Sequence, residues 1–214
     1  MTKRIFVTAT NTDIGKTYTT KLLLKKFASQ GLRVGVIKPI ETGVVNSAPD
    51  GDMLLALIYE LNSELNNINR DDIVPITYQL PSAPFVASHN KPFDFTLLDK
   101  TVKKIEQHSD VLIIEGAGGL YVPIDDKTMM IDLITYLDAT ALLVTHCSLG
   151  CINDTLLSEK ALQDKNIKFI TAFNCRKEDK NFQTVSQPYF LEIEKKVLKI
   201  DREIDTICEL LYNL

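Results

Sequence analysis

The sequence lacks the features that mark a membrane protein or a nucleic-acid-binding protein. Apolar runs such as Val111 to Ile114 and Ala141 to Val144 are four residues long, whereas a span of the bilayer needs roughly 20. Lysine and arginine are scattered and the formal net charge is -4, so no basic stripe is available to displace counterions from phosphates. We therefore expect no membrane partner and no nucleic-acid partner.

Cysteine and histidine are also scarce. The chain has four cysteines (Cys147, Cys151, Cys175 and Cys208) and three histidines, without the paired short spacing of a zinc site. His146 adjoins Cys147, but neighbouring residues on a strand point to opposite faces, so a catalytic Cys/His pair is not expected there. We expect Cys147 and Cys151, which flank the end of an apolar run, to be buried or loop thiols.

The composition is that of a folded protein with a core of its own. The chain has 214 residues, of which 45% are hydrophobic and 24% charged. This balance and length favour one domain over residues 1–214 without metal or disulfide staples. Residues Met1 to Val7 run directly into a strand-like segment with no signal-peptide core, so we expect a cytoplasmic location.

Short β-branched segments alternate with helical patterns along the chain. Runs that are apolar without alternation, such as Val111 to Ile114, are typical of strands buried on both faces of a parallel sheet. Leu23, Phe27 and Gly31 mark a first helix and its end. The sequence predicts strands at 4–9, 33–38, 110–115, 140–145 and 168–173, and further helices at 52–65, 96–108, 129–137, 154–164 and 201–211. This pattern predicts an α/β fold with a mostly parallel central sheet and helices on both faces, whose ligands bind at the carboxyl ends of the strands.

The first predicted strand is followed by a loop that suits a phosphate. The segment Thr8-Ala9-Thr10-Asn11-Thr12-Asp13-Ile14-Gly15-Lys16-Thr17 leads directly into the first helix and resembles a Walker A loop of the P-loop NTPases. Backbone N–H groups and the helix N-terminus would hold an anion, Lys16 would reach terminal phosphates, and Thr17 would ligate Mg²⁺. Thr10 stands where that motif has its first glycine. The alternative is an ordinary strand-to-helix turn with a solvated lysine.

Charged residues also follow two later strands. Lys38 ends the second strand, and because consecutive strands are usually near neighbours we expect it beside the first loop, where two lysines would stabilise a transferring phosphoryl group. Asp52 opens a predicted helix that either Asp50 or Asp52 could cap, and Asp52 is also a candidate magnesium ligand. Glu115 ends a buried strand and, because an unpaired buried acid is costly, requires a cation or strong donors nearby.

Three glycines in four residues follow Glu115. Gly116-Ala117-Gly118-Gly119 would let the backbone approach a ligand closely and offer N–H groups to an anionic or polar substrate. The alternative is a tight turn without a ligand.

Four motifs together resemble the dethiobiotin synthetase family in order and spacing, over about residues 3 to 175. They are the loop ending Gly15-Lys16-Thr17, then Lys38-Pro39-Ile40-Glu41-Thr42-Gly43, Glu115-Gly116-Ala117-Gly118-Gly119, and Leu149-Gly150-Cys151-Ile152-Asn153. The resemblance implies an ATP-dependent enzyme that forms the cyclic urea of dethiobiotin from 7,8-diaminopelargonate, CO₂ and a nucleoside triphosphate with Mg²⁺, in biotin biosynthesis. The reaction would pass through a carbamate and a carbamic-phosphoric anhydride.

The resemblance also implies roles for particular residues. Lys16 and Lys38 would be catalytic, and Thr17, Asp52 and Glu115 would surround Mg²⁺. The residues implied to bind the nucleotide are Thr12, Asp13, Ile14, Gly15, Lys16, Thr17, Tyr18, Asp52, Glu115, Gly116, Ala117, Gly118 and Asn174. Those implied to bind the diamine are Thr12, Lys38, Thr42, Gly118, Gly150, Cys151, Ile152 and Asn153, the last four from the second subunit of a homodimer.

The chain departs from the family pattern at several positions. Ala9 stands where many members have glycine, which a negative φ would accommodate. Cys175 replaces the aspartate that follows the matching Asn174, and residues 190–195 lack the family's Gly-x-Ile-Pro segment, so we expect weaker discrimination between ATP and other triphosphates. The alternative function is a P-loop switch of the partitioning type. Those ATPases carry an extra lysine early in the phosphate loop, whereas this chain has Thr10, Asn11 and Thr12 there.

Overall fold

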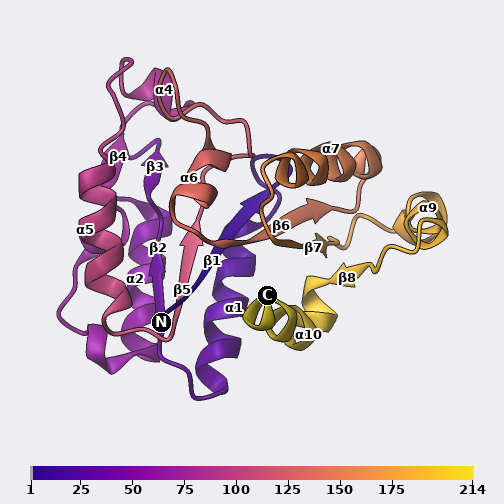
Figure 1. Cartoon of the computed structure of the whole chain (residues 1–214), viewed down its shortest axis with the longest axis horizontal. Coiled ribbons are helices and arrows are strands. Elements are labelled where there is room, and N and C mark those ends of the chain that lie inside the picture. The colour runs from indigo at the N-terminus through magenta and orange to yellow at the C-terminus, as the bar shows by residue number, and fades with distance from the viewer. Residues whose placement is uncertain (1) are drawn as a thin grey trace.

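The computed structural model describes residues 2–214, and its centre is a six-stranded parallel sheet (Figure 1). In their order across the sheet the strands are β2 (Val34–Ile37), β5 (Val111–Glu115), β1 (Lys3–Ala9), β6 (Thr140–His146), β7 (Phe169–Asn174) and β8 (Leu198–Lys199). The five predicted strands are confirmed to within one residue at each end. The two-residue β8 was missed, because it is too short to show a pattern.

Burial on both faces explains why these strands are continuous apolar runs. Every residue of β5 is buried, and so are Ile5 to Ala9 of β1 beside it. Each fully buried aliphatic side chain contributes about 1.5–3 kcal/mol, so the central strands form the thermodynamic core. That core holds the strand ends, and whatever chemistry they carry, in fixed positions.

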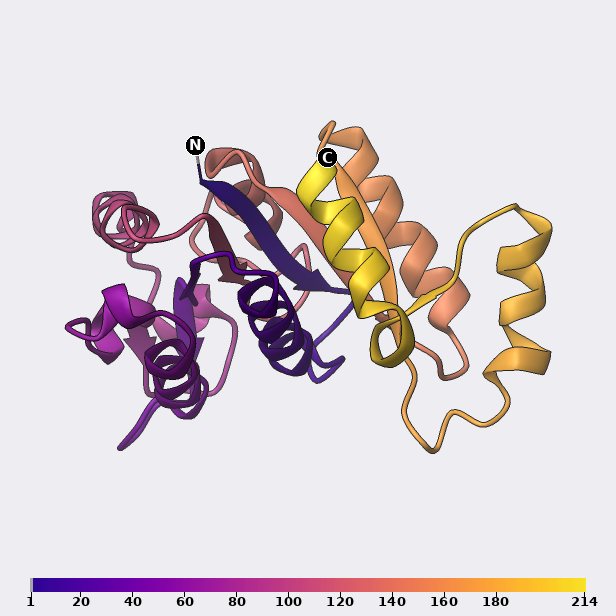
Figure 2. The ribbon, with the colours of Figure 1, turned by 90° about the horizontal axis from the view of Figure 1, so that it is seen from below.

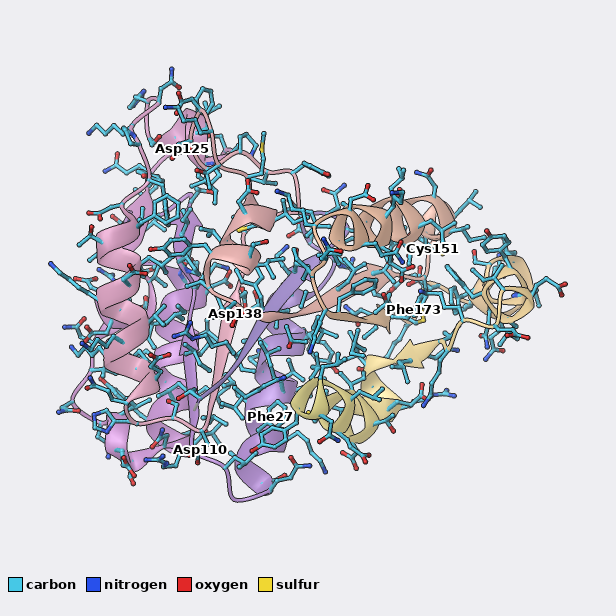
Figure 3. The ribbon with its side chains drawn as sticks, viewed as in Figure 1. Phe27, Asp110, Asp125, Asp138, Cys151 and Phe173 are labelled. Atoms are coloured by element: carbon cyan, nitrogen blue, oxygen red, sulfur yellow. A yellow bond between two sulfur atoms is a disulfide. The ribbon has the colours of Figure 1, made fainter. Side chains whose placement is uncertain are left out.

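Helices cover both faces of the sheet (Figures 1 and 2). α1 and α10 lie side by side on one face, with Phe27 of α1 turned toward α10 (Figure 3). Right-handed crossovers place α5, α6 and α7 on the other face. The helices are α1 (Lys16–Ser29), α2 (Pro49–Leu61), α3 (Arg70–Ile73), α4 (Pro84–Ala87), α5 (Phe95–Glu106), α6 (Met130–Tyr136), α7 (Cys151–Asp164), α8 (Phe182–Val185), α9 (Gln187–Glu192) and α10 (Ile200–Asn213), with a 3-10 turn at Ser63–Leu65. No helix within residues 2–214 combines the length and apolar character needed to cross a membrane.

Two predicted helices differ from the structure by three or more residues at one or both ends, and the other predicted helices agree to within two residues. The helix expected at 52–65 begins earlier, at Pro49, and ends at Leu61, because Asn62 turns into extended backbone and its amide donates to Val34 O and His108 O. The helix expected from Asp154 begins at Cys151, directly after Gly150. Gly150 has φ of 97°, a conformation that glycine adopts readily, and it ends the turn that follows β6.

The order of the strands corrects one expectation. β2 does not neighbour β1; β5 lies between them, paired with both. A second, two-stranded parallel sheet of β3 (Ile40–Thr42) and β4 (Ile76–Tyr78) continues beyond the carboxyl end of β2. Lys38 therefore reaches the first loop across the end of β5, where Glu115 stands.

Residues 176–197, which include α8 and α9, project from the side of the sheet (Figure 2). A separate apolar cluster of Cys147, Cys151, Phe173, Phe182 and Phe190 holds this segment against the start of α7, where Cys151 lies, and the end of β7, where Phe173 lies (Figure 3). Cys151 is a buried free thiol, as expected, and Cys208 is a second one. The expectation was wrong for Cys147, which forms a disulfide with Cys175 because paired strands β6 and β7 end side by side.

Candidate active site

A cavity of about 500 Å³ opens where β1, β2 and β5 end. This is the edge of a parallel sheet at which α/β folds bind their ligands. Its lining comes from the first loop, the two segments after β2 and the glycine-rich turn after β5: Thr12, Asp13, Gly15, Lys16, Thr17, Lys38, Ile40, Glu41, Thr42, Pro49, Asp50, Gly116, Ala117, Gly118 and Arg176.

The loop after β1 has the shape of an anion cradle. Gly15 has φ of 108° and Asp13 has φ of 59°, and α1 begins at the next residue, Lys16, with its N-terminus at the cavity. Within residues 2–214 the N–H groups of Asp13, Ile14 and Gly15 donate to no protein acceptor. Unpaired N–H groups at a helix N-terminus bind phosphate oxygens. Ala9, which precedes this loop, has extended backbone and does not require glycine.

Lys16 lies inside the cradle and is largely buried. Its ammonium donates to Asn11 O at 3.3 Å. Burial lowers its pKa to about 8, and the nearby Glu115 carboxylate opposes that shift. An ammonium so poorly solvated gains strongly from an anionic ligand in the cradle.

Lys38, which lines the cavity, forms a buried ion pair with Glu115 behind it. Lys38 Nζ donates to Glu115 Oε1 at 2.8 Å and also pairs with the Asp50 carboxylate. Glu115 is fully buried and Lys38 is 6% exposed. Burial alone would lower the pKa of Lys38, but the carboxylates of Glu115 and Asp50 outweigh it and raise the pKa above its ordinary value. Lys38 is therefore a fixed positive charge.

Thr17 connects the cradle to this ion pair. Its hydroxyl donates to Glu115 Oε1 at 2.7 Å, so the first loop, β2 and β5 converge on one carboxylate. The other oxygen of that group, Glu115 Oε2, is buried and has no hydrogen-bond partner among residues 2–214. An unpartnered buried carboxylate oxygen is costly and is a hard donor suited to a cation.

Of the two aspartates near the start of α2, the structure brings Asp50 to the cavity. Asp52 is exposed and lies outside the cavity lining, whereas Asp50 lines it and pairs with Lys38. Neither carboxylate caps the helix. The group that does so is Glu41, whose two oxygens accept the N–H groups of Asp50 and Gly51, each at 3.1 Å.

The sequence pattern assigned no role to Glu41 and indicated Asp50 only as a possible helix cap, for identifiable reasons. Glu41 is 5% exposed, and desolvation by burial raises its carboxyl pKa. It lies nine residues before Asp50, whose N–H it accepts, so no local capping pattern points to it. Asp50 and Asp52 are both near the start of the helix. Which of them lies at the cavity depends on the direction of the first helical turn, which the sequence does not specify.

The turn after β5 approaches the first loop closely. Gly116, Ala117 and Gly118 line the cavity, and Gly118 has φ of 66°. A Cβ added to Gly119 would stand 3.3 Å from Thr10 O, so the turn and the first loop are in direct backbone contact. The glycines therefore form one wall of the cavity.

Several predicted site residues lie outside this cavity. Tyr18 is exposed, and its hydroxyl donates to Asp201 Oδ1 at 2.7 Å. Asn174 ends β7, and its amide donates to Ile14 O at 2.7 Å. Gly150, Cys151, Ile152 and Asn153 form the start of α7, and none of them lines the cavity of its own chain.

The described residues fit a nucleotide-bound magnesium ion. Within residues 2–214 no three or more His, Cys, Asp or Glu side chains form a metal cluster, as is normal for Mg²⁺, which takes one or two carboxylates together with substrate phosphates and water. The hydroxyl of Thr17, the Asp50 carboxylate and the unpartnered Glu115 Oε2 are the available oxygen donors.

A phosphate cradle at a helix N-terminus, two lysines and paired carboxylates on a parallel sheet define a P-loop protein built for phosphoryl transfer. A family model described as an AAA domain (AAA_26) matches residues 3–195. Among curated relatives, the ATP-dependent dethiobiotin synthetase of Sulfurovum sp. is 44% identical over 186 residues, covering 87% of this chain and 89% of that protein. That of Wolinella succinogenes is 34% identical over 214 residues, covering 99% of both. The chain belongs to the ATP-dependent dethiobiotin synthetase family.

Solved structures agree on the fold. A plasmid partition protein from Borrelia burgdorferi has a TM-score of 0.60 at 13% identity, covering 99% of this chain and 98% of that chain. The MinC:MinD cell division complex of Aquifex aeolicus has a TM-score of 0.56 at 16% identity, covering 96% and 85%. At such identities the similarity shows a shared P-loop fold and no shared activity.

Proposed function

We propose that this chain is an ATP-dependent cyclo-ligase that forms dethiobiotin from 7,8-diaminopelargonate, CO₂ and ATP in biotin biosynthesis. The observation that carries the proposal is the buried Lys38, held between Glu115 and Asp50 opposite the phosphate cradle. Membership of the dethiobiotin synthetase family supports the same reaction.

The reaction needs two carbon–nitrogen bonds and no protein nucleophile. One substrate amine adds to CO₂ and loses a proton, which gives a carbamate. A carbamate oxygen then takes the γ-phosphoryl group of ATP, which gives a carbamic-phosphoric anhydride and ADP. The second amine attacks the carbamoyl carbon and expels phosphate, and the ring is closed. The protein supplies position and positive charge, as is usual in phosphoryl transfer.

Lys16 and Lys38 approach the transferring group from two sides. Lys16 extends from the cradle and Lys38 from the end of β2, and both line the cavity. Negative charge spreads over the phosphoryl oxygens in the transition state, so two fixed ammonium groups stabilise it more than the ground state. Mg²⁺, held by Thr17, Asp50 and Glu115, would neutralise phosphate charge when bound.

The diamine would lie along the wall opposite the cradle. Thr42 and Gly118 line the cavity near Lys38, and Thr12 stands at the rim of the loop. The tail carboxylate would bind at the start of α7 in the second subunit of a homodimer, through Gly150, Cys151, Ile152 and Asn153. A helix N-terminus favours a carboxylate. That segment does not line its own chain's cavity, and it follows Leu149, which is 88% exposed.

A subunit-mixing experiment tests the shared site. Lys38→Ala and Asn153→Ala variants, each of low activity, are unfolded together and refolded as a 1:1 mixture. Random pairing gives half heterodimers, each with one intact site of two, so we expect about a quarter of wild-type activity. A mixture no more active than the separate variants would contradict the shared site, and a monomer by light scattering would exclude it. We propose a cytoplasmic location because ATP is the co-substrate, which cell fractionation would check.

The direct test of function is product formation. The protein receives 7,8-diaminopelargonate, bicarbonate, Mg²⁺ and ATP or GTP, and dethiobiotin is measured by mass together with released phosphate. We expect one phosphate per dethiobiotin and a loss of at least about 10²-fold in turnover for Lys38→Ala. Hydrolysis that is independent of the diamine, with no ring-closed product, would overturn the proposal and favour a P-loop switch.

The same assay measures nucleotide selectivity. Cys175 is bound to Cys147 and offers no carboxylate to a base, and residues 190–195 lack the family segment. We expect kcat/KM for GTP within about tenfold of that for ATP, because one base contact contributes about 1–1.5 kcal/mol. A much stronger preference for ATP would show that another part of the chain recognises the base.

A further inference from the structure

Two side chains from the end of β7 reach across the sheet edge to the first loop. The Asn174 amide donates to Ile14 O at 2.7 Å, and the Arg176 guanidinium donates to Asp13 O. In the sheet, β7 is separated from β1 by β6, and the paired residues are more than 150 positions apart in sequence. These two bonds therefore connect the phosphate cradle to a distant part of the chain.

The bonds hold the cradle's peptide planes. In a trans peptide the carbonyl and the following N–H point in opposite directions. Fixing Asp13 O therefore fixes the N–H of Ile14, and fixing Ile14 O fixes the N–H of Gly15. These are N–H groups that donate to no acceptor within residues 2–214. The donors on the outer side of the loop thus turn its free N–H groups inward.

The loop needs such support because its backbone is in an unfavourable conformation. Asp13 has φ of 59°, which is uncommon for a residue other than glycine and costs of order 1 kcal/mol. A Cβ on Gly15 would stand 2.1 Å from Asn174 Nδ2, so the carboxamide packs directly against the glycine. The loop keeps its shape only if something outside it holds these peptides.

The supporting segment is itself anchored. Arg176 N donates to Asp179 Oδ2 at 2.8 Å, and Cys175, between the two donors, is bound to Cys147 at the end of β6. The Arg176 side chain also lines the cavity, which adds a third cation to those of Lys16 and Lys38.

We propose that Arg176 is a positioning residue that, together with Asn174, orients the cradle N–H groups toward the phosphates of the nucleotide. It acts through the loop backbone and does not recognise the base. The inference rests on the proposed role of the cavity in binding a nucleoside triphosphate, but it requires no turnover.

The N–H groups that Arg176 would orient bind only the phosphates. The effect of Arg176 on affinity should therefore be the same for any base of the nucleotide. The dissociation constants of ATP, GTP and inorganic tripolyphosphate, each with Mg²⁺ and without diamine, are measured by calorimetry for the wild type and for Arg176→Ala. We expect all three to weaken by a similar factor of about ten. We also expect KM for ATP to rise by that factor, while kcat at saturation changes by less than about twofold.

Two matched variants complete the experiment. Arg176→Lys keeps a donor and should bind within about threefold of the wild type. Lys177→Ala removes the adjacent exposed lysine, which has no hydrogen bond or ion pair within residues 2–214, and should bind normally. Thermal unfolding checks that each variant is folded; if Arg176→Ala is not, Arg176→Gln replaces it.

The outcomes separate the possibilities. A loss for ATP or GTP with tripolyphosphate unaffected would overturn the proposal and make Arg176 a base contact. Unchanged binding of all three ligands would remove Arg176 from the site. Equal losses without any dethiobiotin formed by the wild type would leave the positioning role standing and refute only the proposed function.

Discussion

Variants of the Lys38–Glu115 ion pair can separate the contribution of Lys38 to stability from its contribution to catalysis. Lys38→Met keeps most of the side-chain volume and removes the charge, which leaves the fully buried Glu115 without its cation. Removing one partner of a buried pair costs about 3–5 kcal/mol. For a chain of this size each kcal/mol lowers Tm by about 2–4 °C, so we expect Tm to fall by about 6–20 °C.

Neutralising the partner should restore the fold but not the activity. In Lys38→Met/Glu115→Gln no fully buried charge is left unpaired, because the other partner of Lys38, the Asp50 carboxylate, is 38% exposed and can be solvated. We therefore expect most of the lost Tm to return. Turnover should stay at least about 10²-fold below the wild type in both variants, because the charge that stabilises the transferring phosphoryl group is absent.

The assay combines thermal unfolding, followed by circular dichroism, with dethiobiotin formation at saturating substrates. Lys177→Met, at an exposed position, is the matched control and should leave both quantities unchanged. An unchanged Tm for Lys38→Met would refute the buried ion pair. Recovery of turnover in the double variant would refute the catalytic role of the Lys38 charge.

Three further predictions test other parts of the structure. Asp50→Asn should raise the Mg²⁺ concentration for half-maximal activity by at least about tenfold, whereas Asp52→Asn should change it by less than twofold; equal effects would contradict the placement of the two side chains. Gly15→Ala should weaken ATP binding by at least about tenfold, because of its positive φ and the clash with the carboxamide behind it. Gly31→Ala, at φ of 83° with nothing within 4 Å, is its control and should lower only stability; ATP affinity retained in Gly15→Ala would show that the cradle tolerates a Cβ. Burial raises the pKa of Cys208 to about 12, so its thiolate fraction at pH 8 is about 10⁻⁴, and Cys151, the other free thiol, is also buried. The native protein should therefore react negligibly at that pH with a thiol reagent. The unfolded protein should show two thiols without reductant and four with it; four without reductant would contradict the disulfide.

The sequence alone was sufficient wherever a feature is local. Continuous apolar runs identified the buried parallel strands, because only strands covered on both faces lose all polar positions. Gly15-Lys16-Thr17 and Glu115 could also be found from the sequence, because each follows or ends a predicted strand within one short segment. The family's motifs are of this local kind, which is why they indicated the dethiobiotin synthetases before any contact was known.

Only the tertiary structure decided what depends on contacts between distant segments. The placement of β5 between β2 and β1 brings Lys38 to Glu115, and no pattern within either strand specifies that order. The choice of Asp50 over Asp52 follows from Glu41, which binds the start of α2 from a separate strand. The support of the cradle by Arg176 likewise joins residues far apart in the chain, and such pairings are fixed by packing of the whole core rather than by local propensity.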